Sequence, residues 1–342
     1  MELSRISLIP ESGTPLQYLD SLSTYLGGPK IFLKREDLNG CLTLAGNKLR
    51  KLEYLLSDAL DRNCNVIVTT GGLQSNHART TVAAARKLGL QTVLVLVGEQ
   101  PKEPLEGNLL LDYLLGAELR FTGSSDFSMM EANIEETLRD LENRGDRPYY
   151  IPLGASNPLG TMGFVSACRE LETQLTKSEI EATWQVVAVG SGGTLAGLVV
   201  GSGINQIIKN TLGISVLFES AIIKPKVQEL VLQTKLLAGL QLDTEQIQRN
   251  INISDAFIGQ GYGIATKECL AAIKLLAKTE GIILDPTYTG KAMAGLLEYI
   301  RAGIIGSKDT VIFWHTGGLP GLLASKAFVY NNYVQTQNGK MQ

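Results

Sequence analysis

The chain has 342 residues, which is enough for two domains with substantial hydrophobic cores and excludes a single small module. Its 31 basic and 34 acidic residues give a net charge of −3, and the basic residues are dispersed, so a small-molecule partner is favoured over nucleic acid or an acidic membrane. Four cysteines without paired spacing and two histidines without neighbouring metal ligands argue against structural disulfides and a metal site, and no apolar run approaches the ~18 residues that span a bilayer.

The first predicted elements lead to a lysine at the start of a helix. Residues 30–34 form a short strand, and a polar loop over residues 35–40 follows it. Apolar residues recur at helical spacing after Lys48, so Asn47 is expected to be the N-cap and Lys48 the first helical residue. A cation is disfavoured at the positive end of a helix, which suits a lysine that loses its proton and forms a Schiff base. An ordinary solvated surface lysine is the alternative.

Strands and helices alternate over residues 65–151. A buried strand at 65–70 and the Gly71-Gly72 turn lead into a helix that Ser75 opens. Further strands are expected at 91–97, 118–121 and 149–151, with helices at 105–115 and 129–141. This alternation is typical of a parallel sheet with helices on both faces.

The segment from Pro152 to Pro158 interrupts the alternation, because two prolines and a glycine continue neither a strand nor a helix. We interpret it as a crossing between domains. Beyond it we expect strands at 185–189, 214–218 and 311–314, and helices at 159–174, from 195, at 227–237, 244–251 and 267–278, and up to 297. Thr316 follows the last strand, at the carboxyl end where open α/β sheets bind their ligands.

The loop Gly190-Ser191-Gly192-Gly193-Thr194 lies between a predicted strand and a predicted helix. Its backbone N–H groups and a hydroxyl can converge on one point, as in sites that hold a phosphate. Leu195 stands where a dinucleotide-binding fingerprint needs its third glycine, and no Gly-Lys-Ser/Thr sequence follows to make a P-loop. The loop is therefore a candidate anion cradle, with a turn needed only for packing as the alternative.

Other candidate residues lie at helix starts and in loops. Ser75, Asn76 and His77 begin a helix, where they could hold a carboxylate or serve only as a cap and a hydrogen-bonded helix histidine. Tyr262 and Tyr288 lie in glycine-flanked loops. Each is either an exposed phenol that can serve as an acid or a stacking group, or an aromatic residue of the core. No G-x-S-x-G sequence occurs, which argues against a serine triad.

Motifs with these residues follow one another along almost the whole chain: Ala45-Gly46-Asn47-Lys48-Leu49-Arg50-Lys51, Thr70-Gly71-Gly72-Leu73-Gln74-Ser75-Asn76-His77, Gly190-Ser191-Gly192-Gly193-Thr194, Asp285-Pro286-Thr287-Tyr288-Thr289-Gly290-Lys291 and His315-Thr316-Gly317-Gly318. Together they resemble the family of D-cysteine desulfhydrases and 1-aminocyclopropane-1-carboxylate (ACC) deaminases. The resemblance implies the tryptophan-synthase-β-like fold of pyridoxal-phosphate enzymes (fold type II), an α/β fold with two open twisted parallel-type sheets and helices on both faces. It places a small domain, residues 48–159, within a large cofactor-binding domain of residues 1–47 and 160–342. It also implies a cytoplasmic homodimer.

By position, the resemblance assigns pyridoxal 5'-phosphate to Lys48, Asn76, Gly190, Ser191, Gly192, Gly193, Thr194, Thr289 and Thr316. Lys48 would hold the cofactor as a Schiff base, Asn76 would bond its phenolic oxygen, and Thr316 would meet its pyridine nitrogen. The loop from Gly190 to Thr194 would bind its phosphate. The substrate is assigned to Ser75, Asn76, His77, Tyr262 and Tyr288, and catalysis to Lys48, Ser75, Tyr262 and Tyr288. Ser75 would receive the substrate carboxylate, and Tyr262 and Tyr288 would flank the substrate.

Two positions distinguish the branches of this family. ACC deaminases have a glutamate after the tyrosine of the Asp-Pro-x-Tyr motif and a leucine between the last histidine and its glycines, where this chain has Thr289 and Thr316. The resemblance therefore implies α,β-elimination of D-cysteine to pyruvate, ammonia and hydrogen sulfide. ACC deamination and L-cysteate sulfo-lyase activity are the alternatives within the fold. Outside the enzyme class, the alternatives are a catalytically silent ligand-binding or regulatory protein and a dinucleotide binder. After the fourth strand of the large domain, the resemblance leads us to expect a small residue and a basic one, but this chain has Phe218-Glu219-Ser220. The residues that contact the outer part of the substrate are therefore not assigned.

Overall fold

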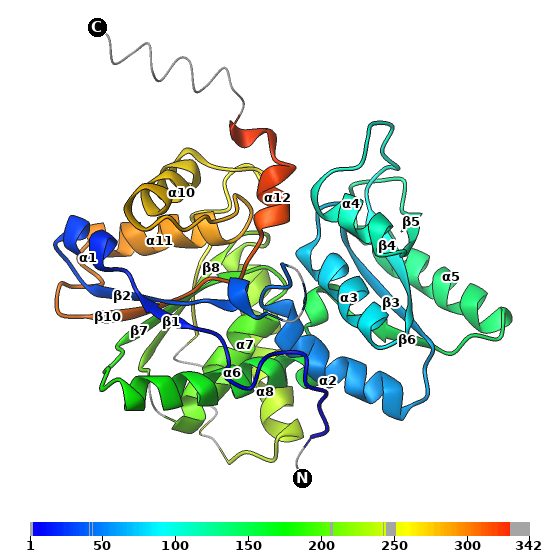
Figure 1. Ribbon diagram of the computed structural model, residues 1–342, viewed down its shortest axis with the longest axis horizontal. Coiled ribbons are helices and arrows are strands. Elements are labelled where there is room, and N and C mark those ends of the chain that lie inside the picture. The colour runs from blue at the N-terminus through cyan, green and yellow to red at the C-terminus, as the bar shows by residue number, and fades with distance from the viewer. Residues whose placement is uncertain are drawn as a thin grey trace, which may run out of the picture.

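The structure is a computed structural model that describes residues 3–40, 42, 44–205, 208–241, 243 and 251–328. These residues form two β-sheets, each with helices packed around it, in the two halves of the molecule (Figure 1). Short 3₁₀ helices lie in the connections: η1 (Glu36–Leu38), η2 (Phe127–Met129), η3 (Leu153–Ala155) and η4 (Lys326–Phe328).

The larger sheet consists of β1 (Leu16–Tyr18), β2 (Lys30–Lys34), β7 (Trp184–Val189), β8 (Asn210–Ser215), β9 (Ile251–Ser254) and β10 (Thr310–Trp314). Their order across the sheet is β1-β2-β10-β7-β8-β9. All neighbouring strands are parallel except β1, which runs antiparallel to β2 at the edge. The expected parallel-type sheet is therefore confirmed for every described pair but this one.

The helices of this half are α1 (Asp20–Leu26), α6 (Pro158–Lys177), α7 (Gly193–Asn205), α8 (Ser220–Leu237), α10 (Lys267–Glu280), α11 (Thr289–Arg301) and α12 (Leu319–Leu323). The buried residues of β10 are all apolar, as expected for a strand that helices cover on both faces. Ile312 and Trp314 join a buried cluster with α6, α7 and α8. Val311 and Phe313 join a second cluster with α1, α10 and α11 on the opposite face.

The smaller sheet consists of β3 (Val66–Gly72), β4 (Gln91–Val97), β5 (Glu118–Phe121) and β6 (Pro148–Ile151), which are parallel in the order β5-β4-β3-β6. Its helices are α2 (Lys48–Asp61), α3 (Asn76–Lys87), α4 (Gly107–Leu114) and α5 (Met130–Asn143). Val93 and Val95 of β4 pack under α5, whereas Leu94 and Leu96 pack under α3 and α4. Both faces of this sheet are therefore buried as well.

The structure differs from the sequence-based expectation at a few elements. Strand β8 ends at Ser215, so the strand expected at 214–218 begins and ends several residues too late. The helix expected at 244–251 falls mostly outside the described residues, and Ile251 is in a strand, β9, rather than a helix. Strand β1, helix α1, strand β9 and helix α12 were not expected. The remaining predicted strands and helices are confirmed; α8 begins at Ser220 rather than at 227, and the other ends shift by a few residues.

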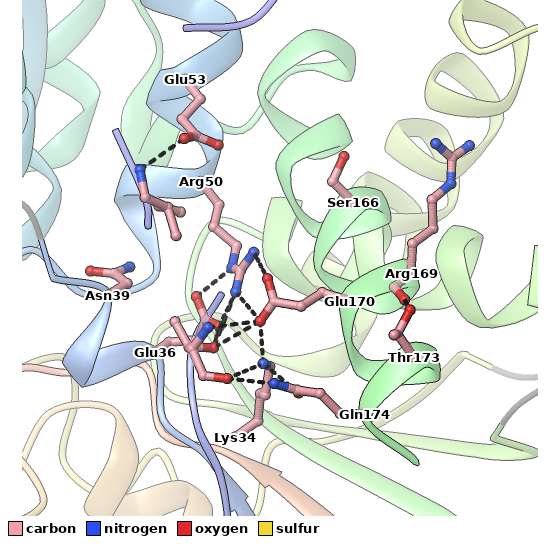
Figure 2. Close-up of polar contacts among 12 residues, drawn as sticks. Lys34, Glu36, Asn39, Arg50, Glu53, Ser166, Arg169, Glu170, Thr173 and Gln174 are labelled. Atoms are coloured by element: carbon pink, nitrogen blue, oxygen red, sulfur yellow. Dashed lines mark hydrogen bonds and ion pairs between the residues drawn. The ribbon is translucent and has the colours of Figure 1, made fainter. Parts of the chain in front are cut away.

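A buried cluster of charges holds α2 against the rest of the chain (Figure 2). The Arg50 guanidinium donates to Glu36 at 2.6 Å and to Glu170 at 2.9 Å, and the Lys34 ammonium also donates to Glu170. Burial alone would raise the pKa of Glu170, but Arg50 and Lys34 outweigh it and lower that pKa to about 2. Arg50 follows Lys48 by two residues, so the cluster fixes the first turn of α2.

The backbones of α2 and α6 also touch. A Cβ on Gly163 of α6 would lie 2.3 Å from the carbonyl oxygen of Arg50, so only glycine permits this approach. Together the charge cluster and the close packing position the start of α2 beside the larger sheet. In the part of the chain that the structure describes, none of the helices combines the length and hydropathy that a bilayer crossing requires.

Candidate active site

A cavity of about 760 Å³, its open mouth included, lies where the carboxyl ends of both sheets meet. Its walls come from the ends of β3 and β7 and from the segments after β8 and β10, together with the first residues of α2, α3 and α7. Open α/β sheets bind ligands at such ends. The predicted site residues that line it are Lys48, Ser75, Asn76, His77, Gly190, Ser191, Gly192, Thr194, Tyr262, Tyr288 and Thr316.

Lys48 is the first residue of α2 and lies half-buried in the cavity wall. Its Nζ donates to Oδ1 of Asn47 at 3.0 Å and lies 5.9 Å from the centre of the Tyr288 ring. Burial lowers the pKa of Lys48 to about 8; Asp285 opposes this shift and Arg79 adds to it. An appreciable fraction of Lys48 is therefore an uncharged amine near neutral pH, which is the form that attacks a carbonyl.

Asn47 precedes α2, as expected, but its side chain does not cap the helix. Nδ2 of Asn47 instead donates to Oγ1 of Thr194 at 3.0 Å, and its backbone N–H donates to the carbonyl oxygen of Thr316 at 3.2 Å. Gly46 has φ +68°, and a Cβ there would lie 2.6 Å from that same carbonyl oxygen. The start of α2 is thus bonded to the start of α7 and to the loop after β10.

The loop from Gly190 to Thr194 connects β7 to α7 at the cavity wall. The first N–H groups of a helix have no partner within the helix, so those of α7 can bind an anion. A Cβ at Gly190 would lie 3.4 Å from the Tyr288 ring, so a larger side chain would project toward the cavity. Gly193 does not line the cavity; its N–H donates to Oγ of Ser156 at 3.2 Å.

Lys51 lies behind this loop and was not predicted as a site residue. Its buried Nζ donates to the carbonyl oxygen of Gly154 at 3.1 Å and to Oγ of Ser156 at 3.3 Å. A Cβ on Gly193 would come within 2.8 Å of that Nζ, so the amine lies directly against the loop. Burial and the neighbouring Lys48 lower the pKa of Lys51 well below its ordinary value. Its position three residues after Lys48, on the same helix face, was the available signal.

Ser75 and His77 are both committed to hydrogen bonds at the start of α3. Ser75 Oγ caps the helix by accepting from the Ala78 N–H at 3.1 Å, which leaves its own proton free to donate. His77 Nε2 lies 2.8 Å from Oγ1 of Thr69, and since that hydroxyl donates to Ile151, the imidazole is the donor. Burial and the nearby lysines lower the pKa of His77 well below its ordinary value, so the ring is neutral.

The hydroxyls of Tyr262 and Tyr288 lie 2.5 Å apart at the cavity wall, with the rings edge to face at 5.8 Å. Burial raises the pKa of both phenols, so both stay protonated at neutral pH. Asp285 holds this part of the wall: its Oδ2 accepts from the backbone N–H of Tyr288 at 2.9 Å. The pair therefore presents protonated hydroxyls beside Lys48.

Thr289 and Thr316, assigned together by resemblance, lie in different surroundings. Thr316 lines the cavity. Thr289 is fully buried and does not line it; its hydroxyl donates to Oδ1 of Asp285 at 2.7 Å and accepts from the Asp285 N–H at 2.9 Å. The hydroxyl of Thr289 is thus occupied by the turn that begins α11. Among the described residues that line the cavity, none is acidic.

The chain belongs to the family described as "Pyridoxal-phosphate dependent enzyme", which it matches over residues 8–317. It is 43% identical over 319 residues to the "Putative 1-aminocyclopropane-1-carboxylate deaminase" of Pyrococcus abyssi, with 93% of this chain and 92% of the relative covered. It is 40% identical over 317 residues to the D-cysteine desulfhydrase of Klebsiella pneumoniae, with 91% and 93% covered.

Comparison with solved structures leads to the same family. The structure described as "ACC deaminase homologue" superposes with a TM-score of 0.86 at 39% identity, covering 98% of this chain and 96% of the other. A fungal L-serine ammonia-lyase from Rhizomucor miehei shares the fold, with a TM-score of 0.63 at 18% identity over 92% and 95% of the two chains. The protein is therefore a pyridoxal-phosphate-dependent enzyme of the ACC deaminase and D-cysteine desulfhydrase type, as the resemblance implied. Relatives named for each activity are similar to this chain at 40 to 43% identity, so these comparisons do not distinguish the two substrates.

The cavity residues fit the cofactor chemically. An aldehyde requires an amine that is partly uncharged, and Lys48 supplies one. A phosphate requires convergent N–H donors and positive charge, which the start of α7 supplies together with the hydroxyl of Thr194. The amide of Asn76 and the hydroxyl of Thr316 complete the polar groups that an aromatic ring with oxygen and nitrogen substituents can meet.

Proposed function

We propose that this enzyme eliminates hydrogen sulfide from D-cysteine and yields pyruvate and ammonia. The observation that carries the proposal is the absence of an acidic side chain among the described residues that line the cavity, where Thr316 stands after β10. A carboxylate beside the pyridine nitrogen would hold a proton there and strengthen electron withdrawal. An uncharged hydroxyl suits a reaction in which a good leaving group, a thiolate, departs from Cβ.

In this proposal the cofactor is held at three points. Lys48 forms the covalent bond with its aldehyde carbon, Asn76 bonds its phenolic oxygen, and the loop from Gly190 to Thr194 binds its phosphate. The buried amine of Lys51 lies directly behind that loop. Thr316 would face the pyridine nitrogen. Thr289 supports this wall through Asp285 rather than by touching the ring.

The substrate carboxylate is bound at the start of α3, where Ser75 has a hydroxyl proton to donate and the helix N-terminus favours an anion. Pyridoxal phosphate, when bound, draws electrons from the substrate α-carbon and so acidifies its proton. Lys48, whose amine lies at the cavity wall, would be the base that accepts this proton. Tyr262 and Tyr288 are both protonated, and since one hydroxyl donates to the other, the second has its proton free for the side of the substrate that carries sulfur.

The atoms balance as follows. Loss of the Cα proton supplies the electron pair for the Cα–Cβ double bond, and the Cβ–S bond breaks with its electrons on sulfur. The thiolate takes up a proton and leaves as hydrogen sulfide. Water hydrolyses the resulting enamine to pyruvate and ammonia. No oxidant or reductant is required.

ACC deamination is the second candidate, because the Pyrococcus relatives carry that name at 42 to 43% identity. Ring opening has no thiolate leaving group and needs stronger electron withdrawal by the ring. We therefore place it below elimination.

The proposal also includes a cytoplasmic, homodimeric state. It further includes a division into a large domain (1–47, 160–342) and a small domain (48–159). This division is supported by the strands, because those at 66–151 form one sheet and those at 16–34 and 184–314 form the other.

The test is a set of assays on the cofactor-loaded enzyme with D-cysteine, L-cysteine, L-cysteate and ACC. Sulfide, sulfite and 2-oxo acids are measured in each. We expect sulfide and pyruvate in equal amounts from D-cysteine, little product from the other three, and none with the Lys48→Ala control. Sulfite from L-cysteate, or efficient ring opening of ACC, would assign the cavity to one of the alternatives.

A further inference from the structure

The amide of Asn76 lies at the cavity wall, on the first residue of α3. An asparagine amide can face a ligand with its oxygen or with its NH₂ group, and the two choices have opposite consequences for an anionic oxygen. Which end is presented depends on what the other end is bonded to. In this structure Oδ1 of Asn76 accepts from Nδ2 of Asn108 at 2.9 Å.

Asn108 is the second residue of α4, which packs beside α3 in the smaller half of the molecule (Figure 1). Its side chain is completely buried, and each of its polar atoms has a partner. Besides bonding Asn76, its Nδ2 donates to the carbonyl oxygen of Gln74 at 3.0 Å. Its Oδ1 accepts from Nε of Arg79 at 3.1 Å.

Arg79 gives this chain of bonds its direction. A guanidinium only donates, so Asn108 must present its oxygen to Arg79 and therefore its NH₂ group to Asn76. Asn76 must then present its oxygen to Asn108, which leaves its own NH₂ group as the end available to the cavity. Burial lowers the pKa of Arg79 to about 10 and Asp112 opposes the shift, so Arg79 remains a charged donor at neutral pH.

Reversing any amide in this chain would be costly. A turned Asn108 would set its NH₂ group against the Arg79 guanidinium and its oxygen against Oδ1 of Asn76, in a place without access to water. Buried polar groups without a partner destabilise by about 1–3 kcal/mol each. The surroundings therefore allow one orientation of Asn76.

We propose that Asn108 and Arg79 are positioning residues that hold the Asn76 amide with its NH₂ group toward an anionic oxygen of the bound cofactor. The inference rests on the proposed contact between Asn76 and the phenolic oxygen. A phenolate only accepts hydrogen bonds, so a donor from Asn76 stabilises it and a turned amide would repel it. Residues outside the cavity thereby control both cofactor affinity and the electronic state of its ring.

The test compares cofactor binding to apoprotein by Asn76→Ala, Asn108→Asp and the double variant. Asn108→Asp keeps an acceptor for Arg79 but loses the donor to Asn76, so Asn76 turns its NH₂ group away from the cavity. We expect the Kd for pyridoxal phosphate to rise about ten- to a hundredfold, with a shift in the visible absorption maximum of the bound cofactor. The change Asn143→Asp, at the exposed last residue of α5, adds the same charge and should alter neither quantity.

The double variant separates positioning from a general structural effect. If Asn108 acts through Asn76, the double variant binds no more weakly than Asn76→Ala alone. Additive losses would overturn the inference. Unchanged binding by Asn76→Ala would instead refute the contact assumed in the proposed function. Weakened binding by Asn76→Ala with unchanged binding by Asn108→Asp would refute the positioning role alone.

A second pair of variants does not depend on the folding of Asn108→Asp. Arg79→Lys retains a group that only donates, whereas Arg79→Met removes it. We expect the absorption maximum to be preserved by lysine and shifted by methionine. The same spectrum in both variants would show that Arg79 does not fix the direction of the Asn76 amide.

Discussion

Replacing Thr194 by valine should weaken cofactor binding without slowing the reaction at saturating cofactor. Thr194 is buried at the start of α7, and its Oγ1 accepts from Nδ2 of Asn47 at 3.0 Å. Its proton is therefore available to a phosphate oxygen. Valine has the same shape but removes both bonds.

The magnitude follows from these two bonds. A hydrogen bond to a charged group contributes about 1.5–3 kcal/mol, and the amide of Asn47 also loses its acceptor. At about 1.4 kcal/mol per factor of ten, the Kd for pyridoxal phosphate should rise about ten- to a hundredfold. The turnover number should change by less than about threefold, because the hydroxyl touches no reacting atom.

Thr161→Val is the matched control. Thr161 is buried on α6, outside the cavity, and its hydroxyl has no partner among the described residues. The same substitution there should leave cofactor affinity unchanged. Absorbance titration of apoprotein and steady-state kinetics measure both quantities. Unchanged affinity with lost turnover in Thr194→Val would refute the role of the loop as a phosphate site.

Three further predictions concern other parts of the molecule. Tyr288→Phe removes one of two paired hydroxyls and should lower the turnover number about a hundredfold while cofactor affinity stays constant; a variant with full turnover would exclude this hydroxyl from the reaction. The rate at which apoprotein takes up pyridoxal phosphate should rise with pH through about 8, because only uncharged Lys48 reacts; a pH-independent rate in stopped-flow absorbance would contradict the shifted pKa. Glu170→Gln should lower the free energy of unfolding by about 3 kcal/mol at pH 7 in urea titrations. The folded-state pKa of Glu170, about 2, lies below its ordinary 4.5. The difference in unfolding free energy should therefore be present above pH 4.5 and vanish as the pH falls toward 2. Glu181→Gln, at an exposed side chain, is the control.

The fold could be predicted wherever the chain has a repeating pattern. Helix α2 begins at Lys48 because apolar residues recur at helical spacing from there. Strand β1 has only three residues, Leu16–Tyr18, and its conformation follows from antiparallel pairing with β2 rather than from a local pattern. Strand β9, with four residues, is similarly short and lies at the other edge. Such strands depend on the sheet that they join.

The site was predictable where motifs lie at element ends, and less so where contacts cross the fold. Lys48, Ser75 and Thr316 line the cavity because turns and helix starts bring them to the carboxyl ends of strands. Asn108 carries no local pattern, and its contact with Asn76 spans 32 residues of sequence. The resemblance assigns Thr289 to the cofactor, whereas in the structure Thr289 does not line the cavity and its hydroxyl is bonded to Asp285.

Borohydride reduction of the cofactor-loaded enzyme, followed by peptide mapping, tests the central claim that Lys48 carries the cofactor. The reduction makes the bond between lysine and cofactor permanent, so the labelled residue can be read directly. We predict a single label on Lys48 and none in Lys48→Ala. A label on Lys51, which lies on the same helix face, or on any other lysine would contradict the account.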